Sequence, residues 1–548
     1  MSLPEPIKEN LKFLLVEVTA LLEKLDSYLL TENKVKAQGI LDRSGYAYNL
    51  RQRIQNRSMA YAADNSPSDA VRARAISDIA GYLDRLTELT RDCVLQTRRL
   101  PEQHDLPLDV YRPLLRRVIK SIPVIDKALL HNDANQALKL GRAESKLNRL
   151  YQSLLSNKTE QLKKRKNTEE LITGLFIAHI FEQMGEVLLT IGESILSSQL
   201  GQTIDMQRFS VMEEAMSEYT QIQNVANLDI CPVAETRSGS GISAVSLPMR
   251  EKTKSRKPHL AIYKDGEQKK LREERDGVES WHRIYPGVAP QILTYKKKGD
   301  LAALLIEHLD GQTFDHIVLK GSPELRTRAI EALAKTLTAI WDETRKRESV
   351  RANFMAQTRK RLSSVYELHP QFEEGKSQVC SYAIDTLDGL MQKVEKLEDA
   401  LPPTFSVFIH GDFNVDNILF NEQNSRIRFI DLHRSTYMDY VQDVSVFMVS
   451  NYRLQAMDAD SRARINSQIN AFYELMDAFA KKRGDKTFNV RLAIGLARSF
   501  ITSTRFIFDP NIAKRLYLRA QYLLRQLSTL NADEAEQYRL NIREIFSE

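Results

Sequence analysis

Cysteine is scarce in this chain of 548 residues, and its use excludes several classes of protein. The three cysteines, Cys93, Cys231 and Cys380, are too few and too far apart for a disulfide framework or a cysteine metal motif. We therefore expect a protein of the reducing cytoplasm. Residues 1–10 hold acidic residues and two prolines instead of a basic start and an apolar core, so we expect no signal peptide.

Long uncharged apolar runs are also missing. The most apolar segment, residues 171–196, is interrupted by Glu182, Glu186 and Glu193. No uncharged run in it reaches the roughly 18 residues that a membrane-spanning helix needs. We expect a buried helix of a bundle at this position, and no membrane span.

A strong excess of one charge is absent as well. The net charge of +6 is small for this length, and basic clusters such as residues 163–166 and 296–298 are short and scattered. This pattern argues against a nucleic-acid-binding surface. An apolar content of 42% is enough for the cores of two or three domains.

The most informative motif is His410-Gly411-Asp412, followed by Asn417 and then by Asp431. Residues 405–409 form a short apolar run, which predicts a buried strand that leads into this loop. Two apolar segments, 418–420 and 427–430, flank turn-forming residues and predict a hairpin between Asn417 and Asp431. The first Asp can accept a hydroxyl proton, whereas the Asn and the second Asp can hold a Mg²⁺ ion that bridges nucleotide phosphates.

This motif resembles the aminoglycoside phosphotransferase and choline kinase family, which has a protein-kinase-like fold of two lobes. The resemblance implies that Asp412 is the catalytic base and that Asn417 and Asp431 are the Mg²⁺ ligands. It implies that His410 orients the loop and that ATP and Mg²⁺ are the cofactors. Asp443 looks like the later structural Asp of the family, which braces the catalytic loop.

A kinase-like lobe requires a nucleotide-binding lobe upstream. Residues 233–247 predict a strand, a tight loop and a second strand, in which Gly239 and Gly241 would let the backbone approach phosphates. A third strand, residues 259–264, ends at Lys264, the expected phosphate-pairing lysine. The alternatives are an ordinary hairpin turn and a lysine that only favours solubility.

Two further segments complete this lobe. Residues 268–285 predict a helix with Glu274 on its apolar stripe, where a buried carboxylate needs a cationic partner such as Lys264; the alternative is a solvated glutamate. Residues 304–311 predict the strand and hinge that join the lobes, with the backbone from Glu307 to Leu309 at the adenine edge. Beyond residue 314 we expect helices, interrupted only by the catalytic segment.

The departures from protein kinases indicate the class of acceptor. The arginine of the usual His-Arg-Asp form is replaced by Gly411, and eleven residues separate Asp431 from Asp443, too few for a long activation segment. An open site of this kind favours a small hydroxylated molecule over a protein chain. The sequence does not identify that molecule, and it does not distinguish ATP from GTP.

The first 200 residues show helical periodicity and an internal repeat. Residues 25–33 match residues 125–133, and residues 79–88 match residues 177–186, at offsets of 100 and 98. Two stacked copies of a three-helix unit explain these offsets. The repeat resembles the PhoU-type domains of bacterial phosphate signalling, which implies contact with a phosphate-signalling or transport complex and pairing into a homodimer.

In PhoU-type domains, acidic pairs in the third helix of each copy can bind metal. The corresponding pairs here are Asp84/Glu88 and Glu182/Glu186. A spacing of four places both carboxylates on one helix face, where they repel unless they share a proton or a cation. The resemblance implies a second metal site; the alternative is a polar stripe that faces solvent or a partner bundle.

The predicted fold class is multidomain, with an all-α PhoU-like bundle followed by an α+β protein-kinase-like two-lobe fold. The bundle spans residues 1–205, a connecting helix 206–227 and the kinase-like domain 228–548, with a small lobe at 228–308 and a large helical lobe at 309–548. We expect transfer of the γ-phosphoryl group of ATP to a hydroxyl of a small molecule, regulated or localised by the bundle. The alternatives are a non-catalytic nucleotide-sensing adaptor and a protein Ser/Thr kinase.

Overall fold

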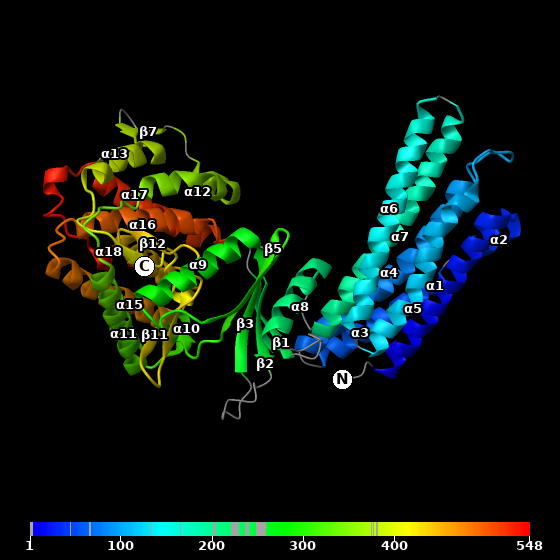
Figure 1. Cartoon of the computed structure of the whole chain (residues 1–548). Coiled ribbons are helices and arrows are strands. Elements are labelled where there is room, and N and C mark those ends of the chain that lie inside the picture. Colours follow the sequence, from blue (N-terminus) through cyan, green and yellow to red (C-terminus); the bar gives the residue numbers. More distant parts are fainter. Residues whose placement is uncertain are drawn as a thin grey trace. The chain divides into compact units, whose positions relative to one another are not determined.

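The structure is a computed structural model, and it describes residues 4–547 except 44, 65–66, 132, 165, 201–203, 221–228, 236–240, 248–258, 374, 376, 380–381 and 457. The chain forms two compact units. The first contains Met1–Gln268 and Leu293–Ile306, and the second contains Lys269–Ile292 and Glu307–Glu548. Figure 1 labels many of the elements of both units.

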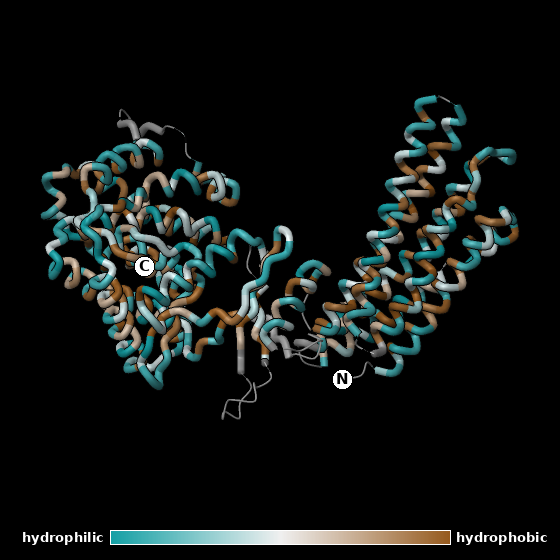
Figure 2. The backbone as a smooth tube through the Cα atoms, in the orientation of Figure 1, coloured by the Kyte–Doolittle hydropathy of each residue, from teal (hydrophilic) through white to brown (hydrophobic). Residues whose placement is uncertain are grey.

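Long amphipathic helices build the N-terminal part of the first unit. In α1, the apolar residues recur every three or four positions and are buried, from Leu11 and Leu14 to Leu22 and Leu25. Figure 2 shows hydrophobic residues recurring along the bundle helices between hydrophilic ones. The helices are α1 (Glu5–Thr31), α2 (Lys34–Leu41), α3 (Tyr46–Ala63), α4 (Pro67–Thr97), α5 (Arg112–His131), α6 (Ala134–Leu162) and α7 (Thr168–Leu200).

The two sequence repeats correspond to α1–α4 and α5–α7, and their last helices, α4 and α7, pack against each other. The expectation of three helices in each copy is wrong for the first copy, whose middle part is split into α2 and α3. The side chain of Asn33 caps the start of α2, and Gly45 enters α3 with a φ of 94°. Glycine adopts this left-handed backbone conformation readily, and the turn that it makes separates the two helices.

A connecting helix and a sheet follow the bundle. Helix α8 covers Met206–Thr220, the described part of the predicted connector. The strands β1 (Asp229–Glu235), β2 (Gly241–Leu247), β3 (His259–Glu267), β4 (Ile292–Lys298) and β5 (Leu301–Glu307) form a sheet of order β1-β2-β3-β5-β4. Strand β1 starts before Pro232, and the pairing register shifts between Pro232 and Ala234, because proline cannot donate to the ladder.

Helix α8 and the sheet share one hydrophobic core with the bundle. Phe209, Met212 and Met216 of α8 are fully buried in the same cluster as Val245 of β2 and Tyr263 of β3. The small sheet, which the sequence assigns to the kinase-like domain, therefore shares its compact unit with the helical repeats.

The second unit is mainly helical around short strands. Its helices are α9 (Gln268–Ile284), α10 (Phe314–Lys320), α11 (Pro323–Thr344), α12 (Phe354–Leu368), α13 (Leu387–Ala400), α14 (Val441–Tyr452), α15 (Ala459–Lys482), α16 (Phe488–Thr504), α17 (Pro510–Ser528) and α18 (Ile542–Ile545). Its strands are β6 (Gln312–Thr313), β7 (Ser377–Val379), β8 (Tyr382–Ile384), β9 (Val407–Ile409), β10 (Ile418–Asn421), β11 (Arg426–Phe429) and β12 (Thr436–Met438).

The element order confirms an all-α bundle followed by an α+β part. The hairpin predicted between Asn417 and Asp431 is also confirmed, with Ile418 opposite Phe429 in an antiparallel ladder. The expectation of helices alone outside the catalytic segment is wrong at β7 and β8. Those two strands are only three residues long, too short for an alternating pattern to stand out in the sequence.

Candidate active site

Strand β9 carries the chain into the catalytic loop. Val407, Phe408 and Ile409 are all buried, and β9 pairs with β12 through Ile409 and Thr436. An apolar strand in the core fixes the position of the polar residues that follow it. His410, Gly411 and Asp412 therefore start from a rigid base.

Gly411 is required by the shape of this loop. Its φ of 83° lies in the left-handed region, and a Cβ atom added to it would lie 2.2 Å from the carbonyl oxygen of Arg434. Any other residue would be strained and would push the Arg434 segment away. The glycine therefore brings Asp412 and the segment after Asp431 into direct contact.

Asp443 braces the loop from the start of α14. Its buried carboxylate accepts hydrogen bonds from the backbone N–H groups of His410 at 2.7 Å and Gly411 at 2.9 Å. Burial raises the pKa of Asp443 to about 7, although both N–H groups favour the charged form. The contact is the brace that the family resemblance implies.

His410 links the two halves of the site. Its Nε2 lies 3.0 Å from the carbonyl of Ile430, and its Nδ1 lies 3.3 Å from the backbone N–H of Asp412. This pattern fits a neutral ring that donates from Nε2 and accepts at Nδ1. Burial lowers the pKa of His410, which favours the same neutral form.

The carboxylate of Asp412 is held at both oxygens. Oδ1 accepts a hydrogen bond from the amide of Asn414 at 2.8 Å, and Oδ2 lies 3.2 Å from the guanidinium of Arg434. Arg453 donates to Asn414 at 3.0 Å and so fixes the orientation of that amide. Asp412 is partly exposed, so a small molecule can reach its carboxylate.

Asn417 and Asp431 are joined by the backbone, since the N–H of Ile430 donates to the carbonyl of Asn417 at 3.0 Å. The amide nitrogen of Asn417 donates to the carbonyl of Asp412 at 2.9 Å, which assigns its oxygen as the group left to bind a cation. Asp431 adopts a φ of 63°, an uncommon conformation for a residue other than glycine. A carboxylate and an amide oxygen are the hard donors that Mg²⁺ prefers, so these residues fit that ion.

Helix α9 contacts the segment that carries Asp431. A Cβ atom on Gly277 would lie 2.2 Å from the carbonyl oxygen of Leu432, so only glycine permits this approach. The indole N–H of Trp281 donates to Ser435 at 2.7 Å, and its ring packs edge-on against Phe408 and Phe429. Any shift of α9 must therefore also move the loop after Asp431.

Residues 268–481 match the model of the Phosphotransferase enzyme family. This range contains α9, the predicted hinge, the predicted catalytic loop and Asp443, and it confirms the resemblance drawn from the motif. The comparisons support a phosphotransferase. A search of curated proteins gives no match.

Solved structures similar to the chain fall into two groups. An aminoglycoside phosphotransferase from Streptomyces rimosus is 18% identical, with 55% of this chain and 99% of that chain covered and a TM-score of 0.34. A choline kinase from Cryptosporidium parvum is 14% identical, with 58% and 96% covered and a TM-score of 0.35. The phosphate transport regulatory protein PhoU from Streptococcus pneumoniae is 16% identical, with 36% and 96% covered and a TM-score of 0.34.

The predicted nucleotide-binding residues begin on the sheet of the first unit, before the matched range. Lys264 is buried on β3 opposite Ile242, and the N–H of Gly241 donates to the carboxylate of Asp265 at 3.0 Å. Gly239 lies outside the described residues. Glu274 is buried on α9 of the second unit, and its pairing with Lys264 stays a prediction.

The predicted hinge follows β5. The N–H of Glu307 donates to the carbonyl of Gln291 at 2.9 Å, and its carboxylate lies 3.5 Å from Arg428. This N–H is therefore engaged within the protein, and the predicted contact of residues 307–309 with an adenine edge stays a prediction. Leu309 is buried.

The acidic pairs of the bundle lie on α4 and α7. Asp84 is buried with Arg51 at 3.0 Å, and Glu88 pairs with Arg85 at 2.9 Å. Burial and the neighbouring Glu186 raise the pKa of Glu182, whose carboxylate lies 3.0 Å from His179. Among the described residues, no three His, Cys, Asp or Glu side chains form a metal-holding group. A metal site here stays a prediction.

In the described part of the chain, one helix, α7, is long and apolar enough to cross a membrane. Half of its most apolar window is buried, and Ile177, Phe181 and Leu188 belong to the bundle core. The core helix of a globular protein passes the same test, so the finding is weak evidence for a span.

Sequence reasoning missed the basic groups around Asp412. Arg434, Arg453, Arg498 and Arg505 line a cavity of about 180 Å³ together with Asp412. Arg498 and Arg505 lie seven residues apart, about two turns of helix, which places them on one face of the chain as it leaves α16. That spacing is visible in the sequence, but the sequence does not show that this helix face lies beside Asp412.

Proposed function

We propose that this protein transfers the γ-phosphoryl group of ATP to a hydroxyl group of a small molecule. The observation that carries the proposal is the bracing of the Asp412 carboxylate together with the backbone link between the segments of Asn417 and Asp431. Asp412 is held by Asn414 and Arg434, while the chain segments of Asn417 and Asp431 are joined by a backbone hydrogen bond. Phosphoryl transfer depends on such positioning more than on covalent chemistry.

In the proposed mechanism, Asp412 accepts the proton of the acceptor hydroxyl. The hydroxyl oxygen forms a bond to the γ-phosphorus as the bond to the ADP oxygen breaks, and the proton later passes from Asp412 to solvent. Asn414 orients the carboxylate, and His410 keeps the Asp412 and Ile430 segments together. Asn417 and Asp431 would hold Mg²⁺, which when bound supplies positive charge against the phosphate oxygens.

ATP is the proposed donor, and Lys264 on β3 is the proposed phosphate contact. A similar solved structure, of the Streptomyces rimosus enzyme, is described as a complex with ADP and streptomycin. The glycine loop, the predicted loop that contains Gly239 and Gly241, would approach the phosphates at Gly241. The N–H of Gly241 donates to the carboxylate of Asp265. Competition between ATP and GTP in a binding titration decides the nucleotide preference.

A role of the helical repeats in regulation is part of the proposal. Arg208 of α8 lies 3.7 Å from Asp265, the residue that anchors Gly241 and follows Lys264. Lys298 of β4 contacts Glu214 of α8 at 2.6 Å. A signal received by the bundle therefore has a route through α8 to the proposed phosphate-binding strands.

The location of the protein in the cell and its partners are also part of the proposal. A cytoplasmic location, a phosphate-signalling or transport complex as partner and a homodimer are each expected from the sequence. Cell fractionation, capture of membrane complexes with the intact chain and light scattering test these three expectations in turn.

The test of the proposed activity is ADP release with Mg²⁺ and ATP across a panel of hydroxylated molecules. We expect turnover that depends on the acceptor. A protein Ser/Thr kinase would instead label proteins in a phosphoprotein screen, although only eleven residues separate Asp431 from Asp443. Tight binding of Mg·ATP without any transfer would support the nucleotide-sensing adaptor.

A further inference from the structure

The cavity of about 180 Å³ beside Asp412, the proposed base, has more positively than negatively charged groups in its lining. Arg434, Arg453, Arg498 and Arg505 face Asp412, the one carboxylate that lines it, and the remaining polar lining consists of serine, threonine and asparagine side chains. Arg434, Arg498 and Arg505 alone outnumber this carboxylate, which leaves an excess of positive charge.

Within the described part of the chain, the hydrogen-bond and stacking partners of Arg498 and Arg505 are neutral groups. Arg498 donates to Gln357 at 2.5 Å and to Ser499 at 3.4 Å, and Arg505 lies over the ring of Phe506. The Nε atoms of both arginines are buried without a hydrogen-bond partner among the described residues. A buried donor is costly to leave unpaired, so an acceptor oxygen that reached these groups would stabilise the site.

The arginines also repel one another. Burial and then the neighbouring cations, including Arg361 and Arg434, lower the pKa of Arg498 and that of Arg505 to about 10, although Asp412 opposes the change. Both groups are still charged at neutral pH. An incoming anion would relieve this repulsion, whereas an incoming ammonium group would add to it.

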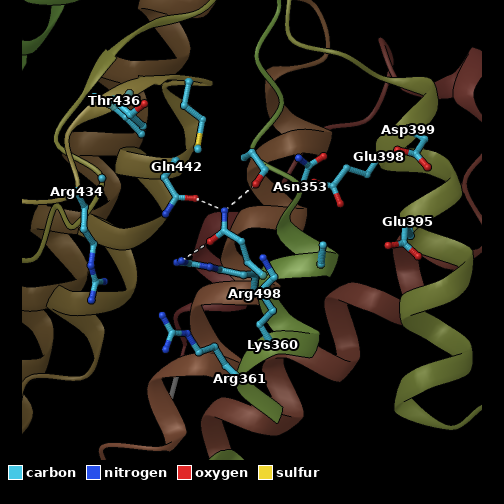
Figure 3. A pocket seen from close by; sticks show the side chains of 16 residues that line it. Asn353, Lys360, Arg361, Glu395, Glu398, Asp399, Arg434, Thr436, Gln442 and Arg498 are labelled. Atoms are coloured by element: carbon cyan, nitrogen blue, oxygen red, sulfur yellow. Dashed lines mark hydrogen bonds between the residues drawn. The ribbon is translucent and has the colours of Figure 1, made fainter. Parts of the chain in front are cut away.

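A second, larger cavity of about 470 Å³ continues the basic surface, because it shares Arg434 and Arg498 and adds Lys360 and Arg361. Figure 3 shows its carboxylates, Glu395, Glu398 and Asp399, together on α13 and apart from Arg498.

Each of these three carboxylates has its own partner. Glu395 pairs with Arg359, Glu398 accepts from the N–H groups at the start of α12, and Asp399 lies 3.2 Å from Arg351. They therefore do not neutralise the arginines at Asp412.

We propose that the acceptor is itself an anion, a hydroxylated molecule that already carries a phosphomonoester group. Arg498 and Arg505 hold this group, and the acceptor hydroxyl lies at Asp412. Arginine is suited to this task, because its planar fork donates two parallel hydrogen bonds to phosphate oxygens. The inference rests on the proposed function; the bound phosphate group takes no part in the bonds made and broken.

The test is a calorimetric titration of the intact wild-type protein with Mg²⁺ and a non-hydrolysable ATP analogue, which fills the γ-phosphate position. The probes are glycerol 3-phosphate, ribose 5-phosphate and glucose 6-phosphate, their neutral parents, and the cations choline and streptomycin. We expect at least one ester to bind roughly a hundredfold more tightly than its parent, as two charge-assisted contacts allow. Tighter binding of a neutral or cationic probe, or no binding of any ester, would overturn the inference.

Variants identify the residues that hold the anion. Arg505→Gln and Arg498→Gln should each weaken the ester roughly tenfold or more and leave the affinity for the ATP analogue unchanged. Arg525→Gln, an exposed arginine of α17, is the matched control. Weaker binding of the analogue with unchanged binding of the ester would assign the arginines to the nucleotide and contradict the inference.

Transfer assays separate this inference from the proposed function. Asp412-dependent phosphorylation of a neutral or cationic probe, with none of the esters, would overturn the anionic acceptor and leave the phosphotransferase standing. Binding of esters without transfer to any probe would overturn the proposed function, and the inference with it.

Discussion

The guanidinium group of Arg434 lies 3.2 Å from the Oδ2 atom of Asp412. This contact holds the carboxylate in place and, in the proposed mechanism, brings positive charge to the point where the phosphoryl group passes. Arg434 is therefore a positioning residue that also shapes the charge of the site.

Replacing Arg434 with glutamine should lower kcat about 10- to 100-fold, because orientation and transition-state charge are both lost. The KM for ATP should change little. Arg434→Lys should restore part of the rate, since a lysine keeps the charge without the fork. Steady-state kinetics with both variants checks this, and an unchanged kcat in Arg434→Gln would show that the contact is incidental.

Gly277→Ala tests the contact between α9 and the Asp431 segment. The new Cβ atom would lie 2.2 Å from the carbonyl of Leu432, so the helix must shift and the second unit should lose about 1–3 kcal/mol of stability. Both tryptophans of the chain, Trp281 and Trp341, are buried in this unit, so their fluorescence reports its unfolding. We expect a lower unfolding midpoint together with lower activity.

The matched control is Gly81→Ala, also within a helix, where a Cβ atom meets nothing within 4 Å. It should leave the tryptophan transition of the second unit unchanged. An equal loss in both variants, or none in Gly277→Ala, would contradict a tight contact at Leu432.

The stability of the second unit should depend on pH through Glu398. Burial raises the pKa of Glu398 to about 7, although the N–H groups of Phe354 and Met355 favour its charged form. The folded protein therefore keeps a proton that the unfolded chain, with a value near 4.5, has already released. Raising the pH from 5 to 8 should lower the free energy of unfolding by about 1–3 kcal/mol through this group.

Urea unfolding followed by tryptophan fluorescence at several pH values measures this slope. Glu398→Gln cannot titrate and should show a shallower fall of stability across the same range. Asp443, whose pKa is also raised to about 7, keeps the remainder of the slope. Identical slopes in wild type and Glu398→Gln would mean that Glu398 is charged throughout.

Arg208→Gln tests the route from α8 to the glycine loop. Asp265 is buried and anchors Gly241, so loss of the nearby cation should loosen that anchor. We expect the KM for ATP to rise roughly three- to tenfold with a small change in kcat. Arg525→Gln serves again as the control, and an unchanged KM in Arg208→Gln would remove α8 from the regulatory part of the proposal.

The sequence predicted those parts of the structure that depend on local patterns of residues. The apolar stripe predicted for α9 is buried: it consists of Leu271, Val278 and Trp281, with Glu274 on the same face. The hairpin between Asn417 and Asp431 also formed as expected, because alternating apolar residues and turn formers act within a few residues of each other.

Contacts between distant segments could not be predicted in the same way. Arg453 directly follows α14 and Arg498 lies on α16, and only packing of those helices brings them to Asp412. The sharing of one core by Phe209 and Tyr263 likewise depends on tertiary packing. Periodicity shows which face of a helix is apolar, but it does not show what that face meets.

The central claim is tested most directly by transfer of label from γ-labelled ATP to an acceptor, compared between wild type and Asp412→Asn. Asp533→Asn, at an exposed position, is the matched control. We predict a labelled small molecule with wild type and the control, and a loss of at least roughly a hundredfold in Asp412→Asn with an unchanged tryptophan transition. Equal labelling by wild type and Asp412→Asn would contradict the assignment of Asp412 as the base.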